Sequence, residues 1–77
     1  MSNIDQEIDV RGLSCPLPIL RAKKALKDMP GGHILKVLAT DPGSVKDFEA
    51  FAKQTQNELL HSEEVDGEFH YLLKKKS

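Results

Sequence analysis

The sequence predicts an α/β fold of two layers, an α+β sandwich in which helices cover one face of a single sheet, with the element order βαβαββ. A chain of 77 residues buries only about 60% of the surface that its unfolded form exposes, so its core is thin. Hydrophobic residues make up 39% of the chain and tryptophan is absent, which suits one covered sheet better than three layers. No repeat or change of composition divides the chain, and we expect residues 1–77 to form one domain.

The first third of the chain predicts a strand followed by a helix. Ile4, Ile8 and Val10 alternate with acidic residues, which is the period-two pattern of a half-buried strand. From residue 16 to about residue 29, apolar residues recur at steps of three and four and predict a helix with one core-facing stripe. This stripe consists of Ile19, Ala22, Leu26 and Met29. Pro30 and the two glycines after it end the helix.

The middle of the chain predicts a second strand and a second helix. Residues 33–39 form an apolar run rich in branched side chains, as expected of a well-buried strand. A strand, a helix and a strand in this order imply a right-handed parallel unit. Ser44 and Asp47 resemble a capping pair at the start of the second helix, and Asp41 is a competing N-cap. The buried stripe of this helix consists of Val45, Phe48, Phe51, Ala52 and Thr55.

The last third of the chain predicts a β-hairpin. Residues 57–65 and 68–75 flank Asp66 and Gly67, a dipeptide that favours a tight turn between antiparallel strands. The apolar positions of these strands are Leu59, Leu60, Val65, Phe69, Tyr71 and Leu73. We interpret the lysines at positions 74–76 as a solubilising terminus.

Charge and cysteine content exclude several classes of protein. The formal net charge of −1 gives no general attraction to nucleic acid or membranes. One cysteine cannot form an internal disulfide, and no cysteine or histidine cluster has zinc-site spacing, so we expect neither a metal nor a cofactor. The N-terminal residues lack the features of a signal peptide, and no run approaches the roughly 20 apolar residues of a membrane span. We expect a cytoplasmic protein.

Cys15 is the candidate reactive residue because it stands where the first helix begins. Pro16 fits the first helical position, which leaves Ser14 or Cys15 as the N-cap. Free N–H groups and the positive end of the helix dipole would stabilise a thiolate there and lower its pKa. The alternative is that Cys15 is a small buried hydrophobic residue. Its position after the first strand favours a reactive site, because loops at the carboxyl ends of parallel strands commonly bind ligands, and Asp41 follows the second strand.

The surroundings of Cys15 in the sequence favour a relay of sulfur. The motif Cys-Pro-Leu-Pro contains no second cysteine that could close a disulfide and release a bound partner. A lone thiolate can instead accept a sulfane sulfur from a donor persulfide and surrender it to an acceptor thiolate. Hydrolytic cysteine catalysis would need a positioned base. We expect no Cys–His dyad, because His33, His61 and His70 lie in or beside predicted strands and far from Cys15 in sequence.

Residues 8–18, with the sequence IDVRGLSCPLP, resemble the TusA/SirA family of small sulfur-carrier proteins. The resemblance extends over nearly the whole chain and includes the basic first helix and the Asp-Pro turn after the second strand. It implies a mixed four-stranded sheet with two helices on one face, similar to the C-terminal domain of translation initiation factor three. It also implies that Cys15 carries the persulfide, as a sulfurtransferase-type covalent carrier. Leu17 stands where TusA proper has Glu, so tRNA thiolation, sulfur oxidation and cofactor sulfuration remain alternative pathways.

Several residues near Cys15 are candidates for supporting roles. Gly12, Pro16 and Pro18 would form the scaffold of the site. Arg21, Lys23, Lys24 and Lys27 are basic positions on the first helix; the resemblance implies a partner-docking role at Lys23, and a solvated helix face is the alternative. Asp41 fits a capping role better than a direct one, and the resemblance adds a role in partner contact.

The expected partners are a cysteine desulfurase or rhodanese-like sulfur donor and a downstream acceptor protein. We expect the protein to bind each of them as a monomer. One alternative is an RNA-binding or regulatory module that uses the basic face of the first helix. The near-neutral charge and the lack of aromatic residues among the basic ones disfavour it, and we expect no nucleic-acid partner. A third hypothesis is a redox sensor, which would require an intermolecular disulfide or a small-thiol adduct at Cys15.

Overall fold

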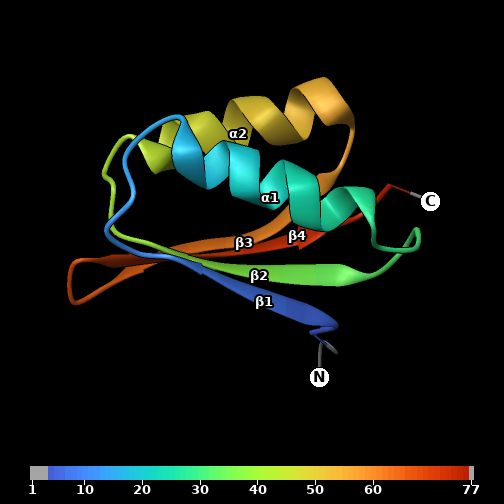
Figure 1. Cartoon of the computed structure of the whole chain (residues 1–77), viewed down its shortest axis with the longest axis horizontal. Helices are drawn as coiled ribbons and strands as arrows, with labels where there is room; N and C mark the ends of the chain where they lie inside the picture. Colours follow the sequence, from blue (N-terminus) through green and yellow to red (C-terminus); the bar gives the residue numbers. More distant parts are fainter. Residues whose placement is uncertain (1–3, 77) are drawn as a thin grey trace.

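Two helices lie side by side on one face of a four-stranded mixed sheet in the computed structural model, which describes residues 4–76 (Figure 1). The predicted element order and the two-layer arrangement are confirmed. The elements are β1 (Gln6–Val10), α1 (Leu17–Lys27), β2 (Ile34–Ala39), α2 (Ser44–Thr55), β3 (Glu58–Val65) and β4 (Glu68–Lys74). The other face of the sheet, which we call the open face, is not covered by either helix (Figure 1).

The strands lie in the order β1-β2-β4-β3, and this order determines where the loops after β1 and β2 lie. β1 and β2 are parallel and adjacent, and their last residues, Val10 and Ala39, pair with each other. β4 runs antiparallel to both β2 and β3. The loops that follow β1 and β2 therefore lie together at one end of the sheet (Figure 1).

The core lies between the sheet and the helices. Leu35, Val37 and Ala39 point from β2 into it and are fully buried, while the residues between them are half-buried on the open face. Ala22 and Leu26 of α1, with Phe48 and Phe51 of α2, cover this surface. The predicted helix stripes are confirmed, with Ile19, Val45 and Thr55 partly buried at their margins.

A buried hydrogen bond links α2 to the sheet. The hydroxyl groups of Ser44 and Tyr71 lie 2.6 Å apart, and both residues are 1% exposed. Phe48 stacks on the Tyr71 ring at a centroid distance of 4.6 Å. The predicted capping pair of Ser44 and Asp47 is wrong, because Gly43 is the N-cap and the Ser44 hydroxyl is turned toward Tyr71.

Three of the predicted apolar strand positions are exposed. Ile4 precedes β1, whose first paired residue is Gln6, and its side chain is 44% exposed. Leu60 is the extra residue of a β-bulge, where β3 shifts register between its neighbours, so the alternation of faces is broken. Val65 ends β3 beside the hairpin turn and, like Leu60, is 40% exposed.

The ends of the last two strands also refine the predictions. Asp66 and Gly67 both have positive φ, 51° and 82°, as the predicted tight hairpin turn requires. Lys75 is more than a solubilising residue, because its Nζ donates a hydrogen bond to the carbonyl of Leu26 in the last turn of α1. A cation at that position is also favoured by the negative end of the helix dipole.

Tyr71→Phe is expected to lower the free energy of unfolding by about 1–3 kcal/mol, because it leaves the buried Ser44 hydroxyl without its partner. Removing both hydroxyls with Ser44→Ala and Tyr71→Phe together should cost less than the sum of the single losses. Urea unfolding of the four proteins measures this cycle. Strictly additive losses would show that the two hydroxyls do not stabilise each other.

Candidate functional site

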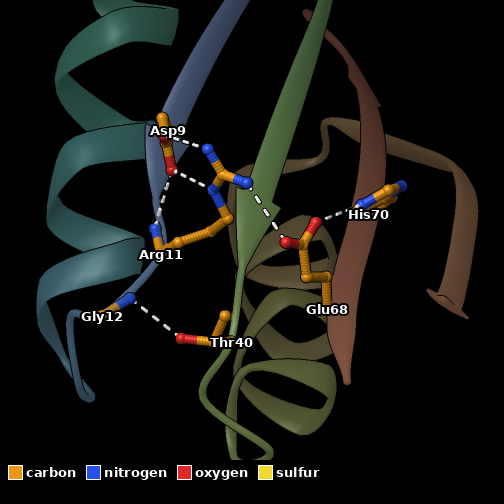
Figure 2. A network of polar contacts seen from close by, with 6 residues as sticks. All are labelled: Asp9, Arg11, Gly12, Thr40, Glu68 and His70. Carbon is orange, nitrogen blue, oxygen red and sulfur yellow. Dashed lines mark hydrogen bonds and ion pairs between the residues drawn. The ribbon is translucent and has the colours of Figure 1, made fainter. Parts of the chain in front are cut away.

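Residues 11–16, which we call the Cys15 loop, leave β1 through a tight turn. The N–H of Leu13 donates to the carbonyl of Val10 at 3.2 Å, and Gly12 has a φ of 82°. That conformation favours glycine, because a side chain there would be strained. The Gly12 N–H donates to Thr40 Oγ1 at 2.8 Å, which binds the turn to the loop after β2 (Figure 2).

Asp41 holds the Cys15 loop from the other side. Its Oδ2 accepts a hydrogen bond from the Cys15 N–H at 3.0 Å, and its Oδ1 accepts one from the Gly43 N–H at 3.2 Å. The prediction that Asp41 is the N-cap of the second helix is wrong, since that position belongs to Gly43. Asp41 instead uses one carboxylate to join the two loops, because the parallel pairing of β1 and β2 brings them together.

The first helix begins one residue later than predicted. Pro16 is itself the N-cap, and α1 starts at Leu17 with the buried Pro18 in its first turn. The Leu17 N–H donates to the Ser14 carbonyl at 2.9 Å, which closes the turn before the helix. Cys15 is therefore outside the helix, and the prediction that Ser14 or Cys15 is the N-cap is wrong.

The Cys15 side chain lies in a shallow groove between the start of α1 and the flank of α2 that carries Asp47 and Gln54. The residue is exposed and its thiol is free, so the alternative of a buried hydrophobic cysteine is wrong. The groove is lined, besides Cys15, by Pro16, Ile19, Asp47, Ala50, Phe51 and Gln54. The thiol is thus open to a partner and bordered by both apolar and acidic side chains.

The predicted lowering of the Cys15 pKa is wrong. The side chain of Asp47, which is positioned to accept a hydrogen bond from the thiol, raises the pKa of Cys15 above its ordinary value. Desolvation and the negative charges of Asp47 and Asp41 raise this pKa further. The thiol form therefore predominates at neutral pH in the free protein. Sequence reasoning assigned Asp47 to helix capping and could not place it beside Cys15 without knowing how α1 packs on α2.

The exposed side of α1 carries two leucines flanked by cations. Leu17 is 43% exposed and Leu20 is 53% exposed. At 100° per residue, both lie on the arc that points away from the core, and Lys24 falls between them in angle. The cations on the two sides of this arc are Arg21 and Lys24 toward β1, and Lys23 and Lys27 toward the C-terminal segment. We call these six residues the α1 docking arc. The structure therefore separates the four predicted basic residues into two pairs.

The histidines are engaged elsewhere. Within residues 4–76, none of the three lines the groove beside Cys15. His33 lies near Asp5, His61 near Glu63 and His70 near Glu68, at 3.6, 3.1 and 3.2 Å.

The family model described as sulfurtransferase TusA matches residues 6–75, which include the Cys15 loop, Asp41 and both helices. The chain belongs to the TusA family. It is 65% identical over 75 residues to the sulfur carrier protein TusA of Allochromatium vinosum, covering 97% of this chain and 99% of that protein. It is 55% identical over 71 residues to a putative sulfur carrier protein of Neisseria meningitidis, covering 92% of this chain and 96% of that protein.

A solved structure has the same fold as this TusA family member. The crystal structure of a SirA-like protein from Desulfitobacterium hafniense matches with a TM-score of 0.83 and 27% sequence identity, covering 94% of this chain and 99% of that one. The predicted family and fold are thereby confirmed.

The protein is therefore a sulfur carrier, and it interacts with sulfur donor and acceptor proteins. Within the described residues, no helix has the length and apolar character needed to cross a membrane.

Asp47→Asn is expected to lower the pKa of Cys15, because it removes the negative charge beside the thiol that is the main cause of the raised pKa. Iodoacetamide reacts with the thiolate, so the variant should be alkylated faster than the wild type at pH 7. The two rates should converge at a pH where both thiols are ionised. A pH–rate profile measures the effect, with Glu49→Gln as a control that removes the same charge from α2 outside the groove. An unchanged midpoint in Asp47→Asn would contradict the role of Asp47.

Proposed function

We propose that Cys15 is the residue that carries sulfur, as a persulfide, between a cysteine desulfurase or rhodanese-like donor and an acceptor protein. The observation that carries this proposal is the placement of an exposed, free cysteine in an open groove, on a loop held by contacts to Thr40 and Asp41. Gly12, Pro16 and Pro18 serve as the scaffold: Gly12 permits the turn, and the prolines fix the chain between the thiol and α1.

Loading and delivery are two exchanges of the same kind. The Cys15 thiolate attacks the outer sulfur of the donor persulfide, a new S–S bond forms to Cys15, and the donor cysteine leaves as a thiolate. In delivery, the acceptor thiolate attacks the outer sulfur on Cys15, and Cys15 leaves as a thiolate. No electrons are gained or lost overall, because the sulfane sulfur moves between thiolates in both steps.

The raised pKa of Cys15 makes loading depend on the partner. A thiol that is mostly protonated is a poor nucleophile when the protein is free. A cation of the donor, placed near Asp47 and Asp41 in the complex, would offset both negative charges and favour the thiolate. In this proposal Asp41 contacts the partner as well as the Cys15 loop.

The α1 docking arc is the surface that receives these partners. Its leucines supply apolar contact beside Cys15, and Arg21, Lys23 and Lys24 attract and orient an acidic surface. The cations act mainly on the rate of encounter, because exposed charges at the rim of an interface steer association more than they add affinity.

The setting that fits this chemistry is a monomeric carrier of one domain in the cytoplasm. A single free thiol persists in a reducing compartment. A monomer leaves the groove and the docking arc free for each partner in turn.

Cys15→Ser is expected to abolish sulfur loading and to leave the fold intact, because the side chain is exposed. Intact mass spectrometry after incubation with a cysteine desulfurase and cysteine measures the loading. The wild type should gain one sulfur atom that a thiol reductant removes, and the variant should gain none. Sulfur on the Cys15→Ser variant, or none on the wild type with several donors while its thiol can be alkylated, would contradict the proposal.

Replacing Arg21 and Lys24 together by Ala is expected to slow loading several-fold at low salt and subsaturating donor. The difference should shrink as salt is added, since salt screens the attraction between exposed charges. Loading rates across a salt series measure this, with Lys53→Ala as a control at the far end of α2. Equal losses at every salt concentration would mean that these cations do not act by electrostatic steering.

A further inference from the structure

An ion-pair network on the open face of the sheet adjoins the Cys15 loop (Figure 2). Arg11 Nε and Nη2 donate to the two carboxylate oxygens of Asp9 at 2.9 and 2.8 Å, and the Arg11 backbone N–H donates to Asp9 Oδ1 at 3.0 Å. Arg11 Nη1 donates to Glu68 Oε2 at 3.1 Å, and Glu68 Oε1 lies 3.2 Å from His70 Nε2. One guanidinium thus bridges two carboxylates.

This network joins strands that are not neighbours. β2 lies between β1 and β4, and Arg11 reaches from the end of β1 past β2 to Glu68, the first residue of β4 (Figure 2). Arg11 also begins the Cys15 loop, and it is one of the two central residues of the turn in which Leu13 bonds back to Val10. The side chain that spans the sheet therefore belongs to the turn that sets the direction of the loop.

The contacts of the Cys15 loop come from three directions. The network anchors its first residue to β1 and β4, Thr40 anchors Gly12, and Asp41 anchors Cys15. Thr40 and Asp41 both belong to the loop after β2, so they place Cys15 relative to α2. The Arg11 bridge adds a connection from this loop to the hairpin of β3 and β4.

We propose that Arg11 is a positioning residue for sulfur transfer: by bridging Asp9 and Glu68 it fixes the turn at the start of the Cys15 loop, and thereby holds Cys15 against Asp41 and α2. This inference rests on the proposed role of Cys15 as the sulfur-carrying residue.

The geometry explains why this bridge matters for position more than for stability. Exposed ion pairs contribute little to the free energy of unfolding, and the side chain of Arg11 is 45% exposed. A two-bonded arginine–carboxylate pair, however, fixes direction in a way that a single contact does not. Arg11 lowers the pKa of Asp9 to about 2, and His70 and Arg11 lower the pKa of Glu68, so the bridge stays charged at neutral pH.

The first test needs no partner protein. Hydrogen exchange of the Gly12 and Cys15 amides, followed by NMR, reports their contacts with Thr40 and Asp41. Arg11→Ala is expected to speed exchange of both amides roughly three- to tenfold, with little change in Tm. The control Lys36→Ala removes a cation from β2 on the same open face and should leave both amides unchanged. Unchanged exchange in Arg11→Ala overturns the proposal.

The second test measures the reaction. At donor concentrations that span KM, Arg11→Ala should lower kcat for loading of Cys15 roughly three- to tenfold, because the thiol is less well placed. KM should stay unchanged, because the α1 docking arc is intact. Arg11→Lys keeps the charge without the two-bonded geometry and should recover only part of kcat. Adding Glu68→Gln to Arg11→Ala should cause no further loss if Arg11 acts through Glu68.

The outcomes separate this inference from the proposed function. Faster amide exchange with an unchanged kcat assigns Arg11 a purely structural role and overturns the inference. If no donor loads the wild type, the proposed function fails, and the pH–rate profile of iodoacetamide alkylation then tests Arg11. Release of the loop from Asp47 and Asp41 should lower the midpoint of this profile in Arg11→Ala. An unchanged midpoint overturns the inference. If Arg11→Ala does not fold, Arg11→Lys and Glu68→Gln carry the same tests.

Discussion

The parallel pairing of β1 with β2 is the constraint on which the site depends. It brings the Cys15 loop beside the loop after β2, so that Thr40 and Asp41 can bind the amides of Gly12 and Cys15. The two loops have no regular structure. They are held together by the side chains of Thr40 and Asp41, which directly follow β2. The exposed thiol is thereby held at a defined position, which the proposed exchange of sulfur at Cys15 requires.

The electrostatics of the thiol follow from the position of Cys15, which lies one residue before the N-cap of α1. Had Cys15 been the N-cap, free helix N–H groups would have faced its sulfur and stabilised the thiolate. Pro16 takes that position instead, the Cys15 amide is used by Asp41, and Asp47 borders the sulfur. The nearest charges are therefore negative, and they raise the pKa of Cys15 where the helix alone would have lowered it. In the proposed relay, the partner that docks beside the two carboxylates controls the reactivity of Cys15.

Local patterns predicted the fold well because each element has a clear local signal. The helix stripes, the apolar second strand and the Asp66–Gly67 turn are all readable at short range. The bulge at Leu60 was not readable, because an extra residue in one strand is defined by its partner strand. The same reason explains the site: Cys15 and its loop were predictable, whereas the contacts of Asp47 with the thiol and of Arg11 with Glu68 join residues far apart in the chain and depend on packing.

If the α1 docking arc receives both partners, as we propose, one small surface serves them in succession. A carrier has to bind its donor long enough for exchange and then leave for its acceptor, so very tight binding would slow the relay. The two exposed leucines offer a limited apolar contact, and in this proposal the cations on both flanks raise the rate of encounter without much affinity. In the proposed relay both partners reach the sulfur on Cys15, and we expect each to present an acidic surface to this arc. If both dock there, as we propose, donor and acceptor cannot bind together, and the persulfide on Cys15 holds the sulfur between the two encounters.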